Sequence, residues 1–389
     1  MSISITGLGI VSAIGMNLEE NLNSLQNLKS GISNIDLINE LQENFIAGEI
    51  KLTNQELSLI AFEKDKQEVF PRSLLLSLIA AKQAWGENKI NPKIKTVIIG
   101  ATTVGGMDLA EKILEKDVRI QALAHNPSGI ITDYLADYFQ LDEFKTTVST
   151  ACSSTANAII LGSRMIKNGL ADRVLVGGGD ALTKFTVNGF NSLRIYDPGF
   201  CKPFDNNRKG LNLGEGAAYI VLENEKSLSI TKNKKVVSIL GWGNANDAYH
   251  QTASSPNGEG AQKSMQLALE EADLKPEDID YINAHGTATV NNDLSEGRAI
   301  ETLFGKNQLF SSTKGYTGHT LAAAGVIECI YSILSIKHKT VFPTLNHNTL
   351  MPELKVKPVI NIKKDITINT VLSNSFGFGG NNATIIIGK

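Results

Sequence analysis

The sequence predicts an α/β protein in which parallel sheets are covered by helices on both faces. Short apolar runs bounded by glycine alternate along the chain with longer stretches of helical periodicity, which is typical of buried parallel strands joined by crossover helices. The 389 residues, of which 42% are hydrophobic and 20% charged, suffice for two medium cores or one fused pair.

The individual elements follow from local periodicity. Short aliphatic and β-branched runs predict strands at residues 2–6, 96–100, 146–149, 174–176, 236–240, 281–283 and 308–311. Apolar residues spaced by three or four predict helices at residues 18–29, 72–85, 129–139, 153–168, 260–272, 295–304 and 320–337.

A polar, lysine-rich segment at 223–235 divides the chain. We therefore expect one half at residues 1–235 and a second at residues 236–389. Each half has a strand-to-turn signal with paired glycines, SITGLG and SILGWG, and each has a reactive turn followed by small residues, VSTACSSTANAII and SSTKGYTGHTLAAAG. These repeated patterns predict two similar α/β units.

Charge and cysteine usage argue against several functional classes. A net charge of -3 does not favour nucleic acid as a partner. We find no apolar run of about 18 residues and no cationic, cleavable leader, so neither a membrane span nor secretion is expected. Three cysteines without a spaced framework favour a reducing cytoplasm, and no CxxC, HxH or HExxH pattern predicts a metal site.

Cys152 is the candidate nucleophile. It lies between a predicted strand ending at Ser149 and a predicted helix that begins with residues 153–155. Free amides and the dipole at a helix N-terminus stabilise a thiolate there. The alternative is a small core residue, which is our interpretation of Cys201 and Cys329. The strand-to-helix turn, and two histidines in similar turns, favour the nucleophile.

Those histidines are His285, in YINAHGTAT, and His319, in STKGYTGH. Both follow predicted strands, and catalytic groups gather at the carboxyl ends of strands in α/β sheets. We therefore expect both to converge on Cys152, where two neutral imidazoles would stabilise an enolate as it forms. The remaining histidines are interpreted as surface or core residues, namely His125, His250, His338 and His347.

Charged residues surround the second histidine motif. Lys314 lies five residues before His319, and Glu328 lies nine residues after it. A charged pair there could set the protonation of the histidines; an exposed turn lysine and a helix-surface carboxylate are the alternatives. Asp293 and Glu296 are expected to cap the helix that follows the first histidine motif.

The segment SNSFGFGGNNAT separates two strand-like segments near the end of the chain. Its glycines permit positive φ angles and close approach of the backbone. Such a turn could place an amide opposite that of the cysteine as an oxyanion hole, with a phenylalanine ring closing the pocket. A simple hairpin loop is the alternative.

Taken together, the motifs resemble the β-ketoacyl-acyl carrier protein synthases of the elongating Cys-His-His type, on the thiolase fold. VSTACSS, KPFDNNRKGLNLGEGAA, NAHGTAT, STKGYTGHTLAAAGVIE and NSFGFGGNN carry the resemblance, which spans nearly the whole chain. Thiolases place a second cysteine near the end of the chain, where GFGGNN has none, and initiating synthases have a Cys-His-Asn arrangement. The resemblance implies a thiolase-like fold of two similar halves in a five-layered αβαβα arrangement.

The resemblance implies a decarboxylative condensation. Cys152 would take an acyl group from a carrier-protein thioester, and His285 and His319 would support decarboxylation of malonyl-acyl carrier protein. The resulting carbanion would attack the acyl-cysteine to give 3-oxoacyl-acyl carrier protein and carbon dioxide. Lys314 and Glu328 would hold the histidine network.

The resemblance also implies roles for residues around the reacting atoms. The amides of Cys152 and Phe378 would form the oxyanion hole, with Phe378 as a gate in the segment that also contains Phe376. Thr287 and Thr289 would contact the phosphopantetheine arm. No dissociable cofactor is implied, because thioester and side chains carry the chemistry.

Partners follow from the same resemblance. Carrier proteins of such systems are acidic, so Lys202, Arg208 and Lys209 are candidate docking residues; ordinary surface charge is the alternative. A homodimer is implied, or a heterodimer with a related inactive subunit. Because LDEFKTTVS replaces the glycine-proline turn expected before the nucleophile, acyl-chain preference stays open, as does fatty acid elongation against a polyene or polyketide pathway.

Two other functions are compatible with parts of the pattern. One is an acyltransferase or thioester hydrolase that uses Cys152 with a single histidine. The other is a chain-length partner subunit of a heterodimeric synthase, against which the retained cysteine argues, because such a subunit needs no nucleophile.

Overall fold

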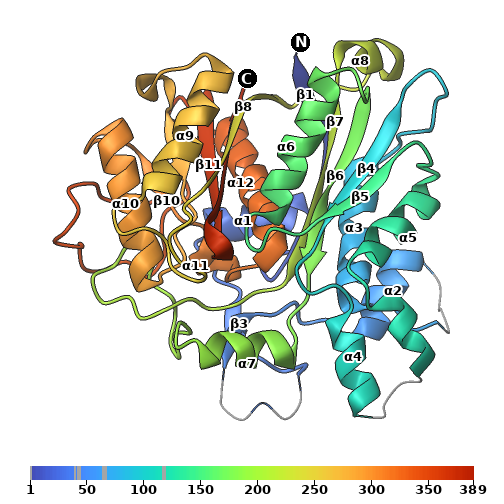
Figure 1. Cartoon of the computed structure of the whole chain (residues 1–389), viewed down its shortest axis with the longest axis horizontal. Helices are drawn as coiled ribbons and strands as arrows, with labels where there is room; N and C mark the ends of the chain where they lie inside the picture. Colours follow the sequence, from blue (N-terminus) through green and yellow to red (C-terminus); the bar gives the residue numbers. More distant parts are fainter. Residues whose placement is uncertain (1, 39–40, 42–44, 64–67, 116–119) are drawn as a thin grey trace.

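A computed structural model of the protein describes residues 2–38, 41, 45–63, 68–115 and 120–389. A ten-stranded sheet organises the chain (Figure 1). Its first-half strands are β1 (Ile3–Ser12), β4 (Thr96–Ala101), β5 (Lys145–Val148), β6 (Arg173–Asp180) and β7 (Gly216–Glu223). Its second-half strands are β8 (Val237–Asn246), β9 (Tyr281–Asn283), β10 (Phe310–Ser311), β11 (Thr370–Gly377) and β12 (Asn381–Gly388).

The two groups of strands have the same topology. Outward from the middle of the sheet, the order is β1-β7-β6-β4-β5 on one side and β8-β12-β11-β9-β10 on the other. β4 is parallel to β5 and β6, as β9 is to β10 and β11, whereas the remaining pairs within each group are antiparallel. The prediction of two similar α/β halves is therefore confirmed.

Helices complete a five-layered arrangement. α3 (Arg72–Trp85) and α5 (Gly129–Phe139) contact the first group of strands, and α9 (Glu259–Ala272) and α10 (Val290–Phe304) lie over the second. Between the groups, α6 (Ser154–Lys167) packs against α12 (Ala324–His338). Figure 1 shows these layers in sequence, from α9 and α10 on the left to α3 and α5 on the right. The predicted α/β class and layer order are confirmed.

The paired glycines of the two halves allow two outer helices to approach the sheet closely. A Cβ atom on Gly9 of β1 would lie 2.0 Å from the carbonyl oxygen of Ala80 in α3. One on Gly243 of β8 would lie 1.9 Å from the carbonyl oxygen of Ser264 in α9. Because no side chain fits at these distances, the repeated glycine pattern reflects equivalent helix-on-sheet contacts in both halves.

Several elements were predicted with their observed bounds, including α3, α5 and β9. α10 begins at Val290, five residues before the prediction, since its polar first turn carries no apolar periodicity. β7 was missed, although all eight of its residues are buried, as they are in β4 and β6, which were predicted. The polar segment 223–235 contains a helix, α8 (Glu225–Thr231).

The remaining elements are short. They are α1 (Leu18–Gln26), β2 (Ile32–Asn34), β3 (Ile46–Gly48), α2 (Asn54–Phe62), α4 (Met107–Leu114), η1 (Ile120–His125), α7 (Lys184–Ser192), η2 (Pro276–Asp278), α11 (Lys314–Thr317), η3 (Leu321–Ala323) and η4 (Phe378–Gly380).

One helical stretch among the described residues, Leu321–His338, is long and apolar enough to cross a membrane. It comprises η3 and α12, and 89% of it is buried inside the protein. Burial between the two groups of strands accounts for its composition, because a helix that is apolar on all sides needs neighbours on all sides.

Candidate active site

Cys152 lies in the turn that joins β5 to α6. It is 6% exposed and precedes the N-cap Ser153, as predicted from the sequence. Ala151 before it has a φ of 51°, the left-handed region that is uncommon for residues other than glycine. The end of β11 reaches this turn: a Cβ on Gly377 would lie 3.1 Å from the backbone nitrogen of Cys152. A side chain at this position would require the Cys152 turn to shift by a few tenths of an ångström, so glycine favours the close approach of the two segments.

Burial dominates the ionisation of Cys152. It raises the pKa of the thiol to about 11, although the Lys314 charge and the amides of Phe378 and of Cys152 itself, which are directed at the sulfur, lower it. The expected stabilising groups are therefore present, but the expectation of a stabilised thiolate is wrong in its net result. Desolvation of a buried anion outweighs them, so the sulfur of the free chain is a thiol.

His285 and His319 lie side by side in the interior. His285 follows β9 and His319 follows α11, and each is 1% exposed. Their ring centroids are 5.2 Å apart and the rings are nearly perpendicular. Burial, together with the nearby Lys314 charge, lowers the pKa of both imidazoles well below the usual value. Both histidines are therefore neutral at physiological pH.

The hydrogen bonds of the rings assign their tautomers. Lys314 Nζ lies 3.1 Å from His285 Nδ1, and the amide of Leu321 donates to His319 Nδ1 at 3.3 Å. Because a cation and an amide can only donate, each Nδ1 is an acceptor and each proton is on Nε2. Among the described residues, His319 Nε2 has no hydrogen-bond partner. A buried donor without a partner is a group available to a ligand.

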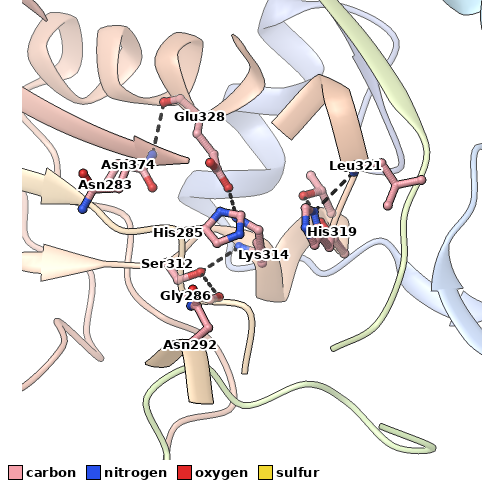
Figure 2. A network of polar contacts seen from close by, with 12 residues as sticks. Asn283, His285, Gly286, Asn292, Ser312, Lys314, His319, Leu321, Glu328 and Asn374 are labelled. Carbon is pink, nitrogen blue, oxygen red and sulfur yellow. Dashed lines mark hydrogen bonds and ion pairs between the residues drawn. The ribbon is translucent and has the colours of Figure 1, made fainter. Parts of the chain in front are cut away.

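Lys314 and Glu328 form a buried ion pair behind the histidines. Their side chains are 2% and 3% exposed. The alternatives, an exposed turn lysine and a helix-surface carboxylate, are therefore wrong. Figure 2 shows Glu328 above Lys314, with Lys314 next to His285. Burial raises the pKa of Glu328 to about 7, against the opposing effect of Lys314. The pair thus holds a donor at His285 Nδ1.

Two further carboxylates hold the backbone of the first histidine motif. Glu296 accepts the amides of His285 and Gly286, each at 2.8 Å, and Asp293 accepts the amide of Ala288 at 3.1 Å. Burial raises the pKa of Glu296 to about 7. The expectation that they cap α10 is wrong: Thr289 is the N-cap residue, and both carboxylates point back at the turn.

The cysteine and the two histidines line one cavity of about 220 Å³. Cys152, His285 and His319 line it together, although they come from distant parts of the chain. The other predicted residues among its lining are Thr287, Thr289, Phe376, Phe378 and Lys209.

Two predicted docking residues lie outside the cavity lining. The guanidinium of Arg208 donates to the carbonyl oxygens of Asp205, Thr289 and Val290, so it braces the turn before α10. Lys202 is partly buried next to Cys201.

Several lining residues were not predicted, among them Phe190 and Arg194. Phe190 of α7 stacks on Phe378, with ring centroids 5.8 Å apart and an angle of 20° between the rings. Arg194 is exposed at the opening of the cavity. No local pattern could identify either, because α7 reaches the site only through the tertiary fold. Within the described part of the chain, no group of three or more His, Cys, Asp or Glu side chains is placed to hold a metal ion.

Comparison with known proteins places both halves in one family. Residues 1–227 match the beta-ketoacyl synthase N-terminal domain, and residues 236–348 match the beta-ketoacyl synthase C-terminal domain. The chain is 33% identical to the 3-oxoacyl-[acyl-carrier-protein] synthase 2 of Staphylococcus aureus (strain COL), over 100% of this chain and 98% of that protein.

Solved structures of the same kind match over the whole chain. The ishigamide ketosynthase/chain length factor superimposes with a TM-score of 0.91 at 28% identity, covering 100% of this chain and 99% of the other. A chain from the complex of the ketosynthase ApeO with its chain length factor ApeC, from Xenorhabdus doucetiae, gives a TM-score of 0.86 at 28% identity, covering 100% of this chain and 98% of that one.

Proposed function

Because this chain belongs to the β-ketoacyl synthase family, we propose that it condenses an acyl group held on Cys152 with malonyl-acyl carrier protein, giving 3-oxoacyl-acyl carrier protein and carbon dioxide. It is a condensing acyltransferase of fatty acid or polyketide elongation. The residue roles are supported by the cavity that Cys152 shares with two neutral imidazoles, one of which has an Nε2–H without a partner among the described residues.

In the first stage, Cys152 attacks the carbonyl carbon of the acyl thioester. The thioester oxygen becomes an oxyanion, which the amides of Cys152 and Phe378 stabilise as donors aimed at the reacting centre. The departing carrier thiolate takes up the proton that the cysteine loses, so acyl transfer needs no outside proton. A thiol in the free chain suits this exchange, because its proton passes to the departing carrier thiolate.

In the second stage, malonyl-carrier protein occupies the same cavity. The Nε2–H groups of His285 and His319 donate to its thioester oxygen while the carbon–carbon bond to the carboxylate breaks. The enolate forms as carbon dioxide leaves, and its carbon attacks the acyl-cysteine. Cys152 leaves as a thiolate and takes up one proton from solvent, which balances the loss of the malonyl carboxylate as carbon dioxide. Neutral histidines suit this step, since they stabilise negative charge as hydrogen-bond donors without transferring a proton to the enolate carbon.

The assay that tests the proposed function uses the wild-type chain with an acyl-carrier protein and malonyl-carrier protein. We expect a 3-oxoacyl-carrier product and carbon dioxide in equal amounts, measured by intact-protein mass spectrometry and by release of labelled carbon dioxide. Hydrolysis of the acyl-carrier without a new carbon–carbon bond would instead support the thioester hydrolase.

Carrier-protein recognition is proposed at the cavity opening. Thr287 and Thr289 share a hydrogen bond of 2.9 Å and line the cavity, where they can contact a phosphopantetheine arm. Lys209, with Lys202 and Arg208 nearby in the sequence, supplies positive charge for an acidic partner. The relatives named above support the carrier protein as partner, since one is a 3-oxoacyl-[acyl-carrier-protein] synthase.

We propose further that two copies of the chain pair through β5, the last strand of the sheet. Ile98 donates to the carbonyl oxygen of Phe144 at 3.1 Å, so the even-numbered residues of β5 bond toward β4. By alternation, the backbone groups of Lys145 and Thr147 point outward. An unpaired strand edge of this kind can accept another strand.

Thr147→Pro tests this pairing. Proline removes one outward amide, so we expect the dimer to dissociate to monomers in light scattering. Thr147→Val is the matched control, because it removes the same hydroxyl, which bonds Thr132 Oγ1 at 2.6 Å, and keeps the amide; it should stay dimeric. A monomeric wild-type chain that dimerises only with a related subunit would favour the heterodimer.

The last proposals concern the cellular location, the use of a cofactor and the boundary between the halves. We propose a cytoplasmic enzyme that uses no dissociable cofactor, supported by the thioester chemistry and cysteine usage. We also propose a boundary between the halves at residues 235 and 236, supported by the start of β8 at Val237.

A further inference from the structure

Asp180 is a buried carboxylate beside the site that the reaction above does not use. It ends β6, is fully buried, and has no ion-pair partner among the residues that the structure describes. In the described part of the chain, its hydrogen-bond donors are hydroxyls and backbone amides. A buried carboxylate with several amide donors is an organising element for the segments that donate to it.

On one side, Asp180 holds the loop that follows β4. The amide of Thr103 donates to Oδ1 at 3.0 Å and to Oδ2 at 3.1 Å, and the amide of Val104 donates to Oδ1 at 3.2 Å. The hydroxyls of Thr102 and Thr103 donate to the two oxygens as well. On the other side, the structure describes a single donor to the carboxylate, the amide of Ala322, which lies 2.9 Å from Oδ2.

That single donor belongs to the turn of His319. Leu321 has a φ of 52°, a conformation that non-glycine residues adopt only when their surroundings hold them there. In this conformation the amide of Leu321 donates to His319 Nδ1, and the next amide donates to Asp180. The carbonyl oxygen of Ala322 accepts from Thr155 Oγ1 in α6, the helix that follows the nucleophile. The turn is therefore held between Asp180 and α6.

We propose that Asp180 is a positioning residue for His319: through the amide of Ala322 it holds the 319–322 turn so that the imidazole Nε2–H faces the cavity. This inference rests on the proposed function, because it concerns the donor used in decarboxylation. Burial raises the pKa of Asp180, against the hydrogen bonds that Thr102, Thr103 and Ala322 donate to it.

Asp180→Asn should keep hydrogen bonds to the loop after β4 and remove the hydrogen bond to Ala322. With its oxygen at the Oδ1 position, asparagine still accepts from Thr102, Thr103 and Val104, but its NH2 group cannot accept from Ala322. We expect malonyl-carrier decarboxylation to fall about tenfold or more, as for a misplaced catalytic group. Acyl transfer to Cys152, followed by intact mass, should change less than about threefold.

Thr103→Val is the matched control, because it removes one hydroxyl donor from the loop side and leaves the contact to Ala322. It should keep decarboxylation within about threefold of wild type. A wild-type decarboxylation rate in Asp180→Asn, or an equal loss in both variants, would overturn the inference. Neither result would contradict the proposed function, because that proposal is tested separately by the condensation assay with the wild-type chain.

A second variant covers the case in which Asp180→Asn does not fold. Thr155→Val keeps the side-chain shape but removes the hydroxyl that holds Ala322 from α6. Decarboxylation should then fall more than acyl transfer, and Thr155→Ser should restore it. Equal losses of the two partial reactions in Thr155→Val would contradict the positioning of His319 through this turn.

Discussion

Replacement of Cys152 by alanine is expected to abolish condensation, with a loss on the order of 10⁴-fold or more, because the nucleophile has no substitute in the cavity. Intact mass should show an acyl adduct on the wild-type chain and none on Cys152→Ala. The two histidines are untouched, so malonyl-carrier decarboxylation should persist. This combination of a lost adduct and retained decarboxylation assigns the two partial reactions to different residues.

Cys201→Ala is the control for this experiment. Cys201 is also a buried free thiol, 1% exposed, but it does not line the cavity. Its adduct formation and condensation should match wild type, apart from the small stability loss of a buried side-chain truncation. If an acyl adduct survived in Cys152→Ala and disappeared in Cys201→Ala, Cys201 would be the nucleophile. Because Cys201 does not line the cavity, that result would refute the mechanism.

The second large effect is expected for His285→Ala and His319→Ala. Each removes one Nε2–H donor from the developing enolate, and loss of one such donor costs roughly 10²–10³-fold in rate. Carbon dioxide release from malonyl-carrier protein should therefore fall by that factor in each variant. Acyl transfer to Cys152 should fall much less, because the amides of Cys152 and Phe378 stabilise that step.

His338→Ala serves as the matched control, since His338 ends α12 outside the cavity; both partial reactions should be unchanged. If His319→Ala released carbon dioxide at the wild-type rate, the two-histidine mechanism would fail. The chain would then be better described as an acyltransferase that uses Cys152 with one histidine.

Much of the site could be predicted because its residues occur in short, ordered motifs. Cys152, His285 and His319 each lie in a turn next to small residues, and such turns are recognisable without knowing their neighbours. Glu296 shows the limit of this approach. Its position near the start of a helix suggested a cap, whereas the fold turns its carboxylate back toward the amides of His285 and Gly286.

Ionisation was the property least accessible from the sequence. A helix N-terminus favours a thiolate at Cys152, and that local effect was predicted. The opposing effect, desolvation, comes from the elements packed around the sulfur, including the end of β11, which lies far away in the chain. The same holds for Asp180 and Phe190: nothing near them in the sequence reveals their contacts with the turn after His319 and with Phe378.

By itself the sequence determined the α/β class and the repeated unit, and it selected the residues that we propose react, because periodicity and motifs depend on spacing along the backbone. Only the tertiary structure decided which charge states those residues have and which groups hold them. Burial, hydrogen-bond donors and nearby charges set a pKa or a tautomer. In this protein they are supplied by strands and helices from both halves of the chain.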